Sequence, residues 1–351
     1  MKRKIIVFAA VSALVASIGA TATAASVARS AELEDIDAAS FDGLTGDRIQ
    51  VRGFADGTVE QKPYLPGTGF GLWTAIPGSV AVGKGDLASI AVAPLDGYLG
   101  ARIFVRGFED GSVEQNFYLP MVGYTGWRDV PDSTAMAVGG DLESIALVVY
   151  DGFFGPRVFL AAFDDGTVFQ NIYTPGHGYT GWHELPKEDH GGDGGGKGGG
   201  ELAALAADAL DGFAGARIFV KAFEDGDVLQ NIYTPTHGYT GWHDVPKPDL
   251  GDGGELESVD VKVLGGGVRL FVIGCVDGRV LQNIYTPTDG FTGWNDVPGA
   301  TPEGSDLQAV TVVPLDGLFG DRIFYRGFED GLVEQNVYRP GLGYTGWIAL
   351  P

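Results

Sequence analysis

Residues 86–131, DLASIAVAPLDGYLGARIFVRGFEDGSVEQNFYLPMVGYTGWRDVP, contain one complete copy of the unit from which the fold can be predicted. Its first segment is mostly apolar with several β-branched residues, and its second alternates polar and apolar side chains, which is typical of strands. Asp110-Gly111 is a hairpin signal between the second segment and the third. The strands expected are residues 86–95, 102–108, 112–118 and 127–131, and tight turns join them into an antiparallel sheet.

The same pattern occurs six times along the chain. All six tryptophans occupy one repeat position, with gaps of 52 to 60 residues between them. Such a fixed period is the sequence signature of a repeat protein. Between the third and fourth repeats, residues 187–200 contain HGGDGGGKGGG and are expected to form a flexible loop. The repeats are expected at residues 32–85, 86–140, 141–200, 201–254, 255–305 and 306–351.

A lone sheet with apolar residues on both faces cannot shield itself from water, whereas copies stacked radially can. We therefore predict an all-β protein, a six-bladed β-propeller of four-stranded antiparallel blades. No strand is exchanged between the first and last repeats, so the ring is expected to close mainly by side-chain packing. In a closed ring, repeats 6, 1 and 2 are neighbours.

The N-terminus has the features of a secretory signal peptide over residues 1–24. The basic residues 2–4 precede an apolar run too short to span a bilayer comfortably, and residues 22–24 have the small side chains of a cleavage site. The rest, residues 25–351, is expected to be one secreted propeller domain without membrane insertion.

The chain is strongly acidic, with a formal net charge of −23 at pH 7 that becomes −26 without the signal peptide. An excess of carboxylates repels phosphate backbones, so no nucleic acid is expected as a partner. The single cysteine, Cys275, stands where the other repeats hold phenylalanine, and we interpret it as a small buried hydrophobe.

Some residues occur in every repeat and most simply serve the blade itself. An Asp-Gly pair follows the second strand in all six repeats, and its aspartate is expected to form the turn, since glycine permits positive φ there. The other shared residues are a Gln, a Tyr three positions later and a Pro two after that, as in Gln115, Tyr118 and Pro120.

Repeats 1, 2 and 6 differ from the others on both sides of the Asp-Gly turn. They carry an arginine before it and a glutamate after it, whereas repeats 3 to 5 lose both residues together. The pairs are Arg52 and Glu60, Arg106 and Glu114, and Arg326 and Glu334. A further arginine lies twelve residues before each glutamate, at Arg48, Arg102 and Arg322, and this arginine persists in the other repeats.

Arginine, glutamate and an aromatic ring on adjacent strands suit a sugar. The charged groups can hydrogen-bond to vicinal hydroxyls, while the ring packs on the apolar C–H face. The alternative is a cross-strand ion pair, such as Arg106 with Glu114, that serves only the sheet.

The chain resembles the fungal fucose-specific lectins in its six tandem units, its twelve-residue Arg–Glu spacing across an Asp-Gly turn and its closing Gly-Trp, as in Gly126-Trp127. Related bacterial propeller lectins are similar as well. The resemblance implies fucose pockets between adjacent blades, formed by Arg, by Glu or Gln, and by an aromatic residue. Because the tryptophan recurs in every repeat, a purely structural role for it stays open. The resemblance assigns ligand binding to Arg48 and Glu60, Arg102 and Glu114, and Arg322 and Glu334, with Trp73, Tyr124, Trp127, Tyr344 and Trp347 as the aromatics.

Catalysis needs a singular constellation of groups, whereas this chain reuses the same residues from copy to copy. The sequence contains no nucleophile elbow, metalloprotease motif or phosphate loop, so no catalytic residue, metal or cofactor is expected. Three functions remain. We favour a lectin for extracellular glycans over a platform for protein–protein interaction and over a glycan-active hydrolase or lyase. The identity of the sugar and the oligomeric state stay open at this level.

Overall fold

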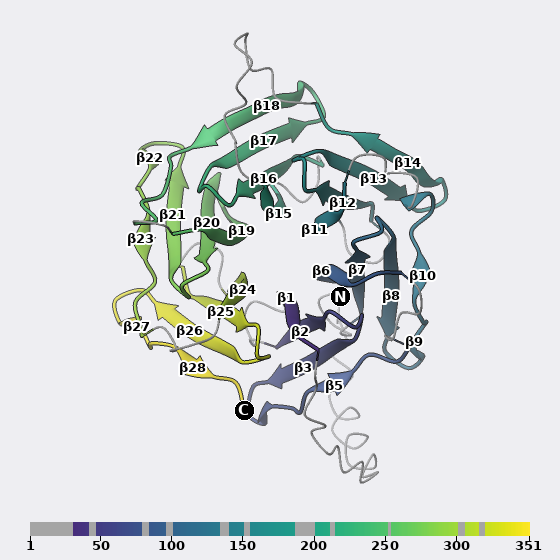
Figure 1. Ribbon diagram of the computed structural model, residues 1–351, viewed down its shortest axis with the longest axis horizontal. Helices are drawn as coiled ribbons and strands as arrows, with labels where there is room; N and C mark the ends of the chain where they lie inside the picture. The colour runs from purple at the N-terminus through teal and green to yellow at the C-terminus, as the bar shows by residue number, and fades with distance from the viewer. Residues whose placement is uncertain are drawn as a thin grey trace, which may run out of the picture. The chain divides into compact units, whose positions relative to one another are not determined.

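Each repeat folds into one antiparallel sheet, and the six sheets surround a central channel (Figure 1). Within each sheet the first three strands pair in chain order, the outer strand or both of its halves pair with the third, and among the described residues no strand is exchanged between repeats. The predicted six-bladed β-propeller is therefore confirmed. The signal peptide and the loop at 187–200 lie outside the described residues. The computed structural model describes residues 31–41, 47–78, 84–95, 101–133, 140–150, 155–186, 201–210, 215–251, 254–300, 306–315 and 320–351.

The strands of blades 1 to 3 follow the repeats closely. Blade 1 contains β1 (Leu33–Ser40), β2 (Arg48–Phe54), β3 (Val59–Leu65), β4 (Gly69–Phe70) and β5 (Thr74–Ala75). Blade 2 contains β6 (Leu87–Pro94), β7 (Arg102–Phe108), β8 (Val113–Leu119), β9 (Gly123–Tyr124) and β10 (Arg128–Asp129). Blade 3 contains β11 (Leu142–Val149), β12 (Arg157–Phe163), β13 (Val168–Thr174) and β14 (Gly178–Glu184).

Blades 4 to 6 repeat this order. Blade 4 contains β15 (Leu202–Ala209), β16 (Arg217–Phe223), β17 (Val228–Thr234) and β18 (Gly238–Val245). Blade 5 contains β19 (Leu256–Gly265), β20 (Val268–Cys275), β21 (Val280–Thr286), β22 (Gly290–Phe291) and β23 (Asn295–Asp296). Blade 6 contains β24 (Leu307–Pro314), β25 (Arg322–Phe328), β26 (Val333–Arg339), β27 (Gly343–Tyr344) and β28 (Ile348–Ala349).

The outer strand differs from the expectation for residues 127–131. It begins earlier, at Gly123, and both of its halves pair with β8, while Trp127 lies in the gap between them. Blades 3 and 4 keep the outer strand continuous. The tryptophan thus sits at the rim of each blade, beside the third strand.

The ring has two distinct faces. The hairpin face carries the six Asp-Gly turns, in which the aspartate Oδ1 accepts a hydrogen bond from the N–H two residues on, as Asp110 does from Ser112 at 2.9 Å. All six turn glycines have φ between 77° and 88°, which confirms the aspartate as a turn former. The tip face, at the other end of the blades, carries the turns between the third strand and the outer strand, such as residues 65–69.

The last blade meets the first by the same contact that joins every other pair of blades. The Leu33 N–H donates to the Glu329 carbonyl at 3.0 Å, and Leu87 donates to Ala55 in the same way at 3.0 Å. Leu33, Ile36 and Phe54 of blade 1 then pack with Ile323 and Val333 of blade 6. The ring therefore closes by packing, as expected, and blades 6, 1 and 2 are neighbours.

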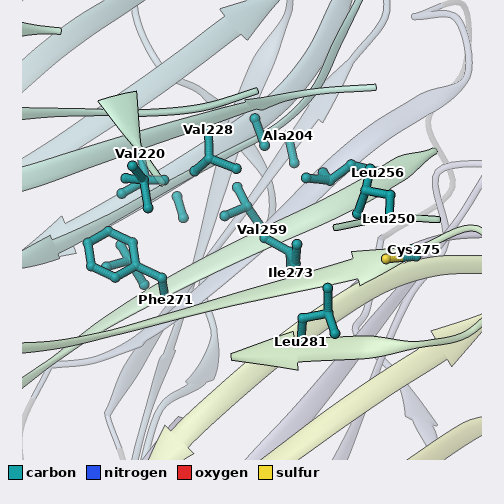
Figure 2. Close-up of a cluster of buried hydrophobic side chains, with 14 of the residues drawn as sticks. Ala204, Val220, Val228, Leu250, Leu256, Val259, Phe271, Ile273, Cys275 and Leu281 are labelled. Carbon is teal, nitrogen blue, oxygen red and sulfur yellow. The ribbon is translucent and has the colours of Figure 1, made fainter. Parts of the chain in front are cut away.

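Most of the core lies between the blades. The cluster between blades 4 and 5 joins Val220 and Val228 to Val259 and Ile273, and Cys275 lies within it (Figure 2). Cys275 is fully buried, and burial raises the pKa of its thiol to about 11, so the thiol stays neutral. This confirms that it packs as a small hydrophobe.

Gly107 of blade 2 offers a test of this packing, because side chains of blade 3 lie directly against its Cα. A Cβ atom at Gly107 would lie 2.5 Å from Leu142 Cδ2 and 2.8 Å from Ile145 Cγ2. We expect Gly107→Ala to lower the free energy of unfolding by about 1–3 kcal/mol, since overpacking forces neighbouring side chains and backbone to shift. Urea unfolding measures it, and an unchanged midpoint would show that the blades can separate freely here.

Candidate functional site

The contact between blades 1 and 2, called junction 1/2, centres on Arg106. Its Nε and Nη2 donate to Glu114 Oε2 at 2.7 and 2.5 Å, and its Nη1 donates to the Gly57 carbonyl of blade 1 at 2.7 Å. The guanidinium also stacks on the Trp127 ring, with its carbon 4.2 Å from the ring centroid. Burial lowers the pKa of Arg106 and Glu114 partly offsets this, but an arginine stays charged. Arg106 therefore links its own glutamate and tryptophan to the preceding blade.

The same arrangement recurs at junctions 6/1 and 5/6. Arg52 donates to Glu60 at 2.9 Å and to the Gly331 carbonyl at 2.8 Å, and its carbon lies 4.2 Å from the Trp73 centroid. Arg326 donates to Glu334 and to the Gly278 carbonyl, both at 2.8 Å, and lies 4.2 Å from Trp347. We call these three sets the Arg–Glu–Trp clusters.

The other three junctions lack the charged pair. At junction 3/4, Lys221 donates to the Gly166 carbonyl at 3.3 Å and lies 4.6 Å from the Trp242 centroid, but a leucine replaces the glutamate. Junctions 2/3 and 4/5 hold Ala161 and Ile273 in place of the arginine, and both are fully buried. A blade junction can therefore form without an arginine or a glutamate.

The β-sheet register separates the residues that the twelve-residue spacing had paired. Glu60 lies opposite Arg52, whereas Arg48 lies opposite Tyr64. The same holds in blades 2 and 6, where Glu114 faces Arg106 and Glu334 faces Arg326. The cross-strand ion pair considered from the sequence is therefore present, and it involves the nearer arginine of each blade.

Arg48, Arg102 and Arg322 lie toward the tip face and stack on tyrosines of their own blades. Their guanidinium carbons lie 3.6, 4.0 and 4.4 Å from the centroids of Tyr64, Tyr118 and Tyr338. Arg102 Nη2 also donates to Gln61 Oε1 of blade 1 at 3.0 Å.

The repeated glutamine also links neighbouring blades, through the tyrosine that precedes the tryptophan by three residues in the next blade. Gln61 Nε2 donates to the Tyr124 hydroxyl of blade 2, and Gln282 Nε2 donates to the Tyr344 hydroxyl of blade 6. Tyr124 and Tyr344, two of the aromatics expected to contact ligand, are thus held by the preceding blade. Four of the six repeated glutamines make this contact, whereas Gln230 and Gln335 precede blades that have Phe291 and Phe70 at the tyrosine position.

The tryptophans join the blades too. Trp182 and Trp242 each donate from Nε1 to the last proline of the preceding repeat, Pro131 or Pro186, at 3.0 Å. Trp73, Trp127 and Trp347 differ from these in lying over an arginine that holds a glutamate. The repeated tryptophan is therefore structural in part, and its surroundings distinguish blades 6, 1 and 2.

A second polar site lines the central channel, which encloses a cavity of about 190 Å³. Lys262 Nζ lies 3.1 Å from Asp260 Oδ1, and Thr311 Oγ1 donates to Asp260 at 3.0 Å and to Asp37 at 3.2 Å. Burial lowers the pKa of Lys262, but the carboxylates of Asp260, Asp37 and Asp208 outweigh it and raise this pKa overall. The Lys262 ammonium group thus interacts electrostatically with three carboxylates that come from three blades.

The channel aspartates also connect the inner strands. Asp35 Oδ2 accepts from Ile90 N at 2.9 Å, Asp37 Oδ2 from Val92 N at 2.7 Å, and Asp260 Oδ2 from Val312 N at 2.8 Å. Each bond reaches from one blade to the next. Burial raises the pKa of Asp35 to about 7 and that of Asp37 to about 6.

Three glutamates of alternate blades, Glu34, Glu143 and Glu257, line the same cavity near the hairpin face. Burial, followed by repulsion from neighbouring carboxylates, raises the pKa of each to about 7. No group of three or more His, Cys, Asp or Glu in the described ranges is arranged to hold a metal ion.

No protein-family model matches the sequence, and no curated protein matches it. Solved structures match in fold. AofleA from Arthrobotrys oligospora has a TM-score of 0.61 at 11% sequence identity, over 91% of this chain and 87% of that one. The six-bladed, fucose-recognising lectin of Aleuria aurantia has a TM-score of 0.56 at 11% identity, over 91% and 96%. The BP39L lectin of Burkholderia pseudomallei has a TM-score of 0.56 at 13% identity, over 91% and 99%. The likeness at these identities shows the shared propeller fold.

Proposed function

We propose that this protein is an exported lectin that binds fucose-containing glycans at junctions 5/6, 6/1 and 1/2. The observation that carries the proposal is the recurrence of the Arg–Glu–Trp cluster, with one geometry, at three consecutive junctions. Junctions 2/3, 3/4 and 4/5 form without the cluster, so the fold does not require it.

The cluster offers the groups that a sugar needs. The arginine holds the carboxylate and the indole in fixed positions, which lowers the cost of ordering them around a ligand. The side chains of Arg52, Glu60 and Glu334 keep 19%, 12% and 14% of their surface exposed, so they can meet hydroxyls at the rim. The tryptophan ring supplies the platform for the C–H face of the pyranose. At junction 1/2, Lys84 Nζ lies 2.7 Å from Glu114 Oε1, so we expect this pocket to be the weakest of the three.

Fucose is proposed as the sugar because structural neighbours have been solved with fucose-containing ligands. The Aleuria aurantia lectin, which shares the fold, has been solved as a mutant with α-methyl-L-fucoside and with Fucα1-6GlcNAc. Several weak sites in one arc also suit multivalent attachment to a glycan-covered surface, where modest contacts combine.

Replacing the three cluster tryptophans tests the proposal. We expect the triple variant Trp73→Phe/Trp127→Phe/Trp347→Phe to lower the apparent affinity for a fucosylated surface at least a hundredfold, because all three platforms shrink together and avidity is lost. The matched control is Trp182→Phe/Trp242→Phe/Trp294→Phe, which alters the same repeat position in the blades without the cluster and should bind as the unaltered protein does. Surface plasmon resonance on immobilised Fucα1-6GlcNAc measures both.

Equal losses in the two triple variants would assign the tryptophans a structural role alone. A glycan array on which the unaltered protein binds nothing would contradict the lectin function itself and favour a protein-interaction platform. Release of free sugar from a bound glycan would instead indicate a hydrolase.

A further inference from the structure

All the large apolar side chains that are strongly exposed, among the residues the structure describes, lie in blades 6, 1 and 2. Four of the six are in tip-face turns, and these four are Leu65, Met121, Val122 and Leu342. The equivalent turns of blades 3 to 5 are polar. The residues that replace Val122 and Leu342 there are His177, His237 and Asp289.

Met121 is the most exposed of these residues and has an unfavourable backbone conformation. Its side chain is 97% exposed and its φ is 75°, in the left-handed region that disfavours a side chain. Blades 1, 3 and 6 have glycine at this position, at φ of 90°, 81° and 79°. Methionine here therefore costs backbone strain and gains no packing within the protein, which indicates a contact outside it.

The three apolar turns lie at one level of the ring. Leu65 pairs with Gly69, Leu119 with Gly123, and Arg339 with Gly343, so each turn closes the same hairpin of its blade. Because blades 6, 1 and 2 are neighbours, the turns form an arc on the tip face (Figure 1).

We propose that these three turns insert into the interfacial region of a zwitterionic lipid bilayer. Each turn carries only one or two apolar side chains and stands apart from the next, whereas a protein partner would need a contiguous apolar core. Acyl chains can fill the space around separate tips. This departs from the sequence expectation of no membrane insertion, since apolar side chains would enter the bilayer surface. No helix in the described ranges is long and apolar enough to cross a membrane.

The charge distribution favours this orientation. Every repeat begins at the hairpin face with a glutamate or aspartate. In four of the six blades a second acidic residue just after the second strand hydrogen-bonds to its backbone, and these residues are Glu109, Asp164, Glu224 and Glu329. These carboxylates lie at the far end of the blades from the tips. The net charge of −23 also opposes self-association, which makes a second copy of the chain a poorer occupant.

Vesicle sedimentation tests the proposal on the full secreted chain. We expect the unaltered protein to co-sediment with sucrose-loaded vesicles of phosphatidylcholine. The tip variant Leu65→Thr/Met121→Gly/Val122→Thr/Leu342→Thr takes residues found in the other blades and should bind at least tenfold more weakly. The control Leu72→Ser/Ile348→Thr removes the two exposed apolar side chains that lie outside the tip turns and should bind unchanged.

Three results would overturn the proposal: no binding by the unaltered protein, equal binding by the tip variant, or equal losses in the tip variant and the control. Sedimentation equilibrium tests the alternative that the tip turns bind a second copy of the chain. A dimer of the unaltered protein that is lost in the tip variant would support that alternative. Binding to Fucα1-6GlcNAc should be the same in the tip variant and the unaltered protein, so this test and that of the lectin function fail independently.

Discussion

Lys262→Met is expected to lower the free energy of unfolding by about 3 kcal/mol at pH 8, because it leaves one buried and two half-buried carboxylates of the channel without their cation. Asp37, Asp208 and Asp260 come from three blades and share this lysine, whose pKa they raise against the effect of burial. Methionine keeps the length and apolar stem of lysine, so the loss reports on charge. Urea unfolding followed by tryptophan fluorescence measures it.

Lys247→Met is the matched control. Lys247 lies 2.9 Å from Asp227, but its side chain is 55% exposed, so its removal should cost less than about 0.5 kcal/mol. Adding Asp260→Asn to Lys262→Met should restore part of the lost stability, since one of the unpaired charges disappears. If Lys262→Met and Lys247→Met unfold at the same urea concentration, the channel network does not hold the ring together.

The fold could be predicted from the sequence because six copies of one unit could be compared within the chain. The constant position of tryptophan revealed the period, and the Asp-Gly pairs marked one turn in every copy, with Asp56-Gly57 as the first. A meander that is apolar on both faces then leaves few solutions other than a ring. The interruption of the outer strand near Trp127 could not be predicted, since two-residue strands give no periodic signal.

The pairing of side chains at the candidate site could be predicted in part, while their role in ligand binding stays a prediction. Repeats 3 to 5 lack the equivalents of both Arg52 and Glu60, which indicated that the two residues act together. The structure shows that they form an ion pair. The resemblance drew attention to Arg48, twelve residues before Glu60, but a tight turn at Asp56-Gly57 places residues eight apart opposite each other at this point of the hairpin. Counting outward from the turn identifies the ion pair, whereas the ligand-binding role that the resemblance assigns to Arg48 stays a prediction.

The channel network was missed altogether. Asp37 and Asp260 share one repeat position and Asp208 and Lys262 share another, but the other copies hold alanine, valine or threonine there, so a comparison of repeats shows no shared charged motif. They come together only when the ring closes and every inner strand faces the axis. Their proximity is a property of the assembled ring and has no counterpart in a single blade.

Acidification from pH 8 to pH 5 is expected to raise the free energy of unfolding by about 3 kcal/mol and the melting temperature by about 5 °C. The pKa values of Glu34, Asp35, Glu143 and Glu257 are raised to about 7 and that of Asp37 to about 6, chiefly by burial. In the unfolded chain these carboxyls titrate at their ordinary values of 3.8 for Asp and 4.5 for Glu. Between about pH 4.5 and pH 7 the folded protein therefore binds more protons than the unfolded chain, so stability falls as the pH rises.

Asp35→Asn isolates this effect at one site. The asparagine Oδ1 can still accept the hydrogen bonds from Ser89 Oγ and Ile90 N, which lie 2.7 and 2.9 Å from the aspartate Oδ2. Its Nδ2 gives up the bond that Asp35 Oδ1 accepts from Ile36 N at 2.7 Å, but the side chain carries no charge to desolvate. The variant should be more stable than the unaltered protein by about 1–2 kcal/mol at pH 8 and nearly equal to it at pH 5. Scanning calorimetry across this range measures both curves. A melting temperature that falls steadily on acidification of the unaltered protein would show that the channel carboxyls are solvated and titrate normally, and the account of the channel as a buried charge network would then be wrong.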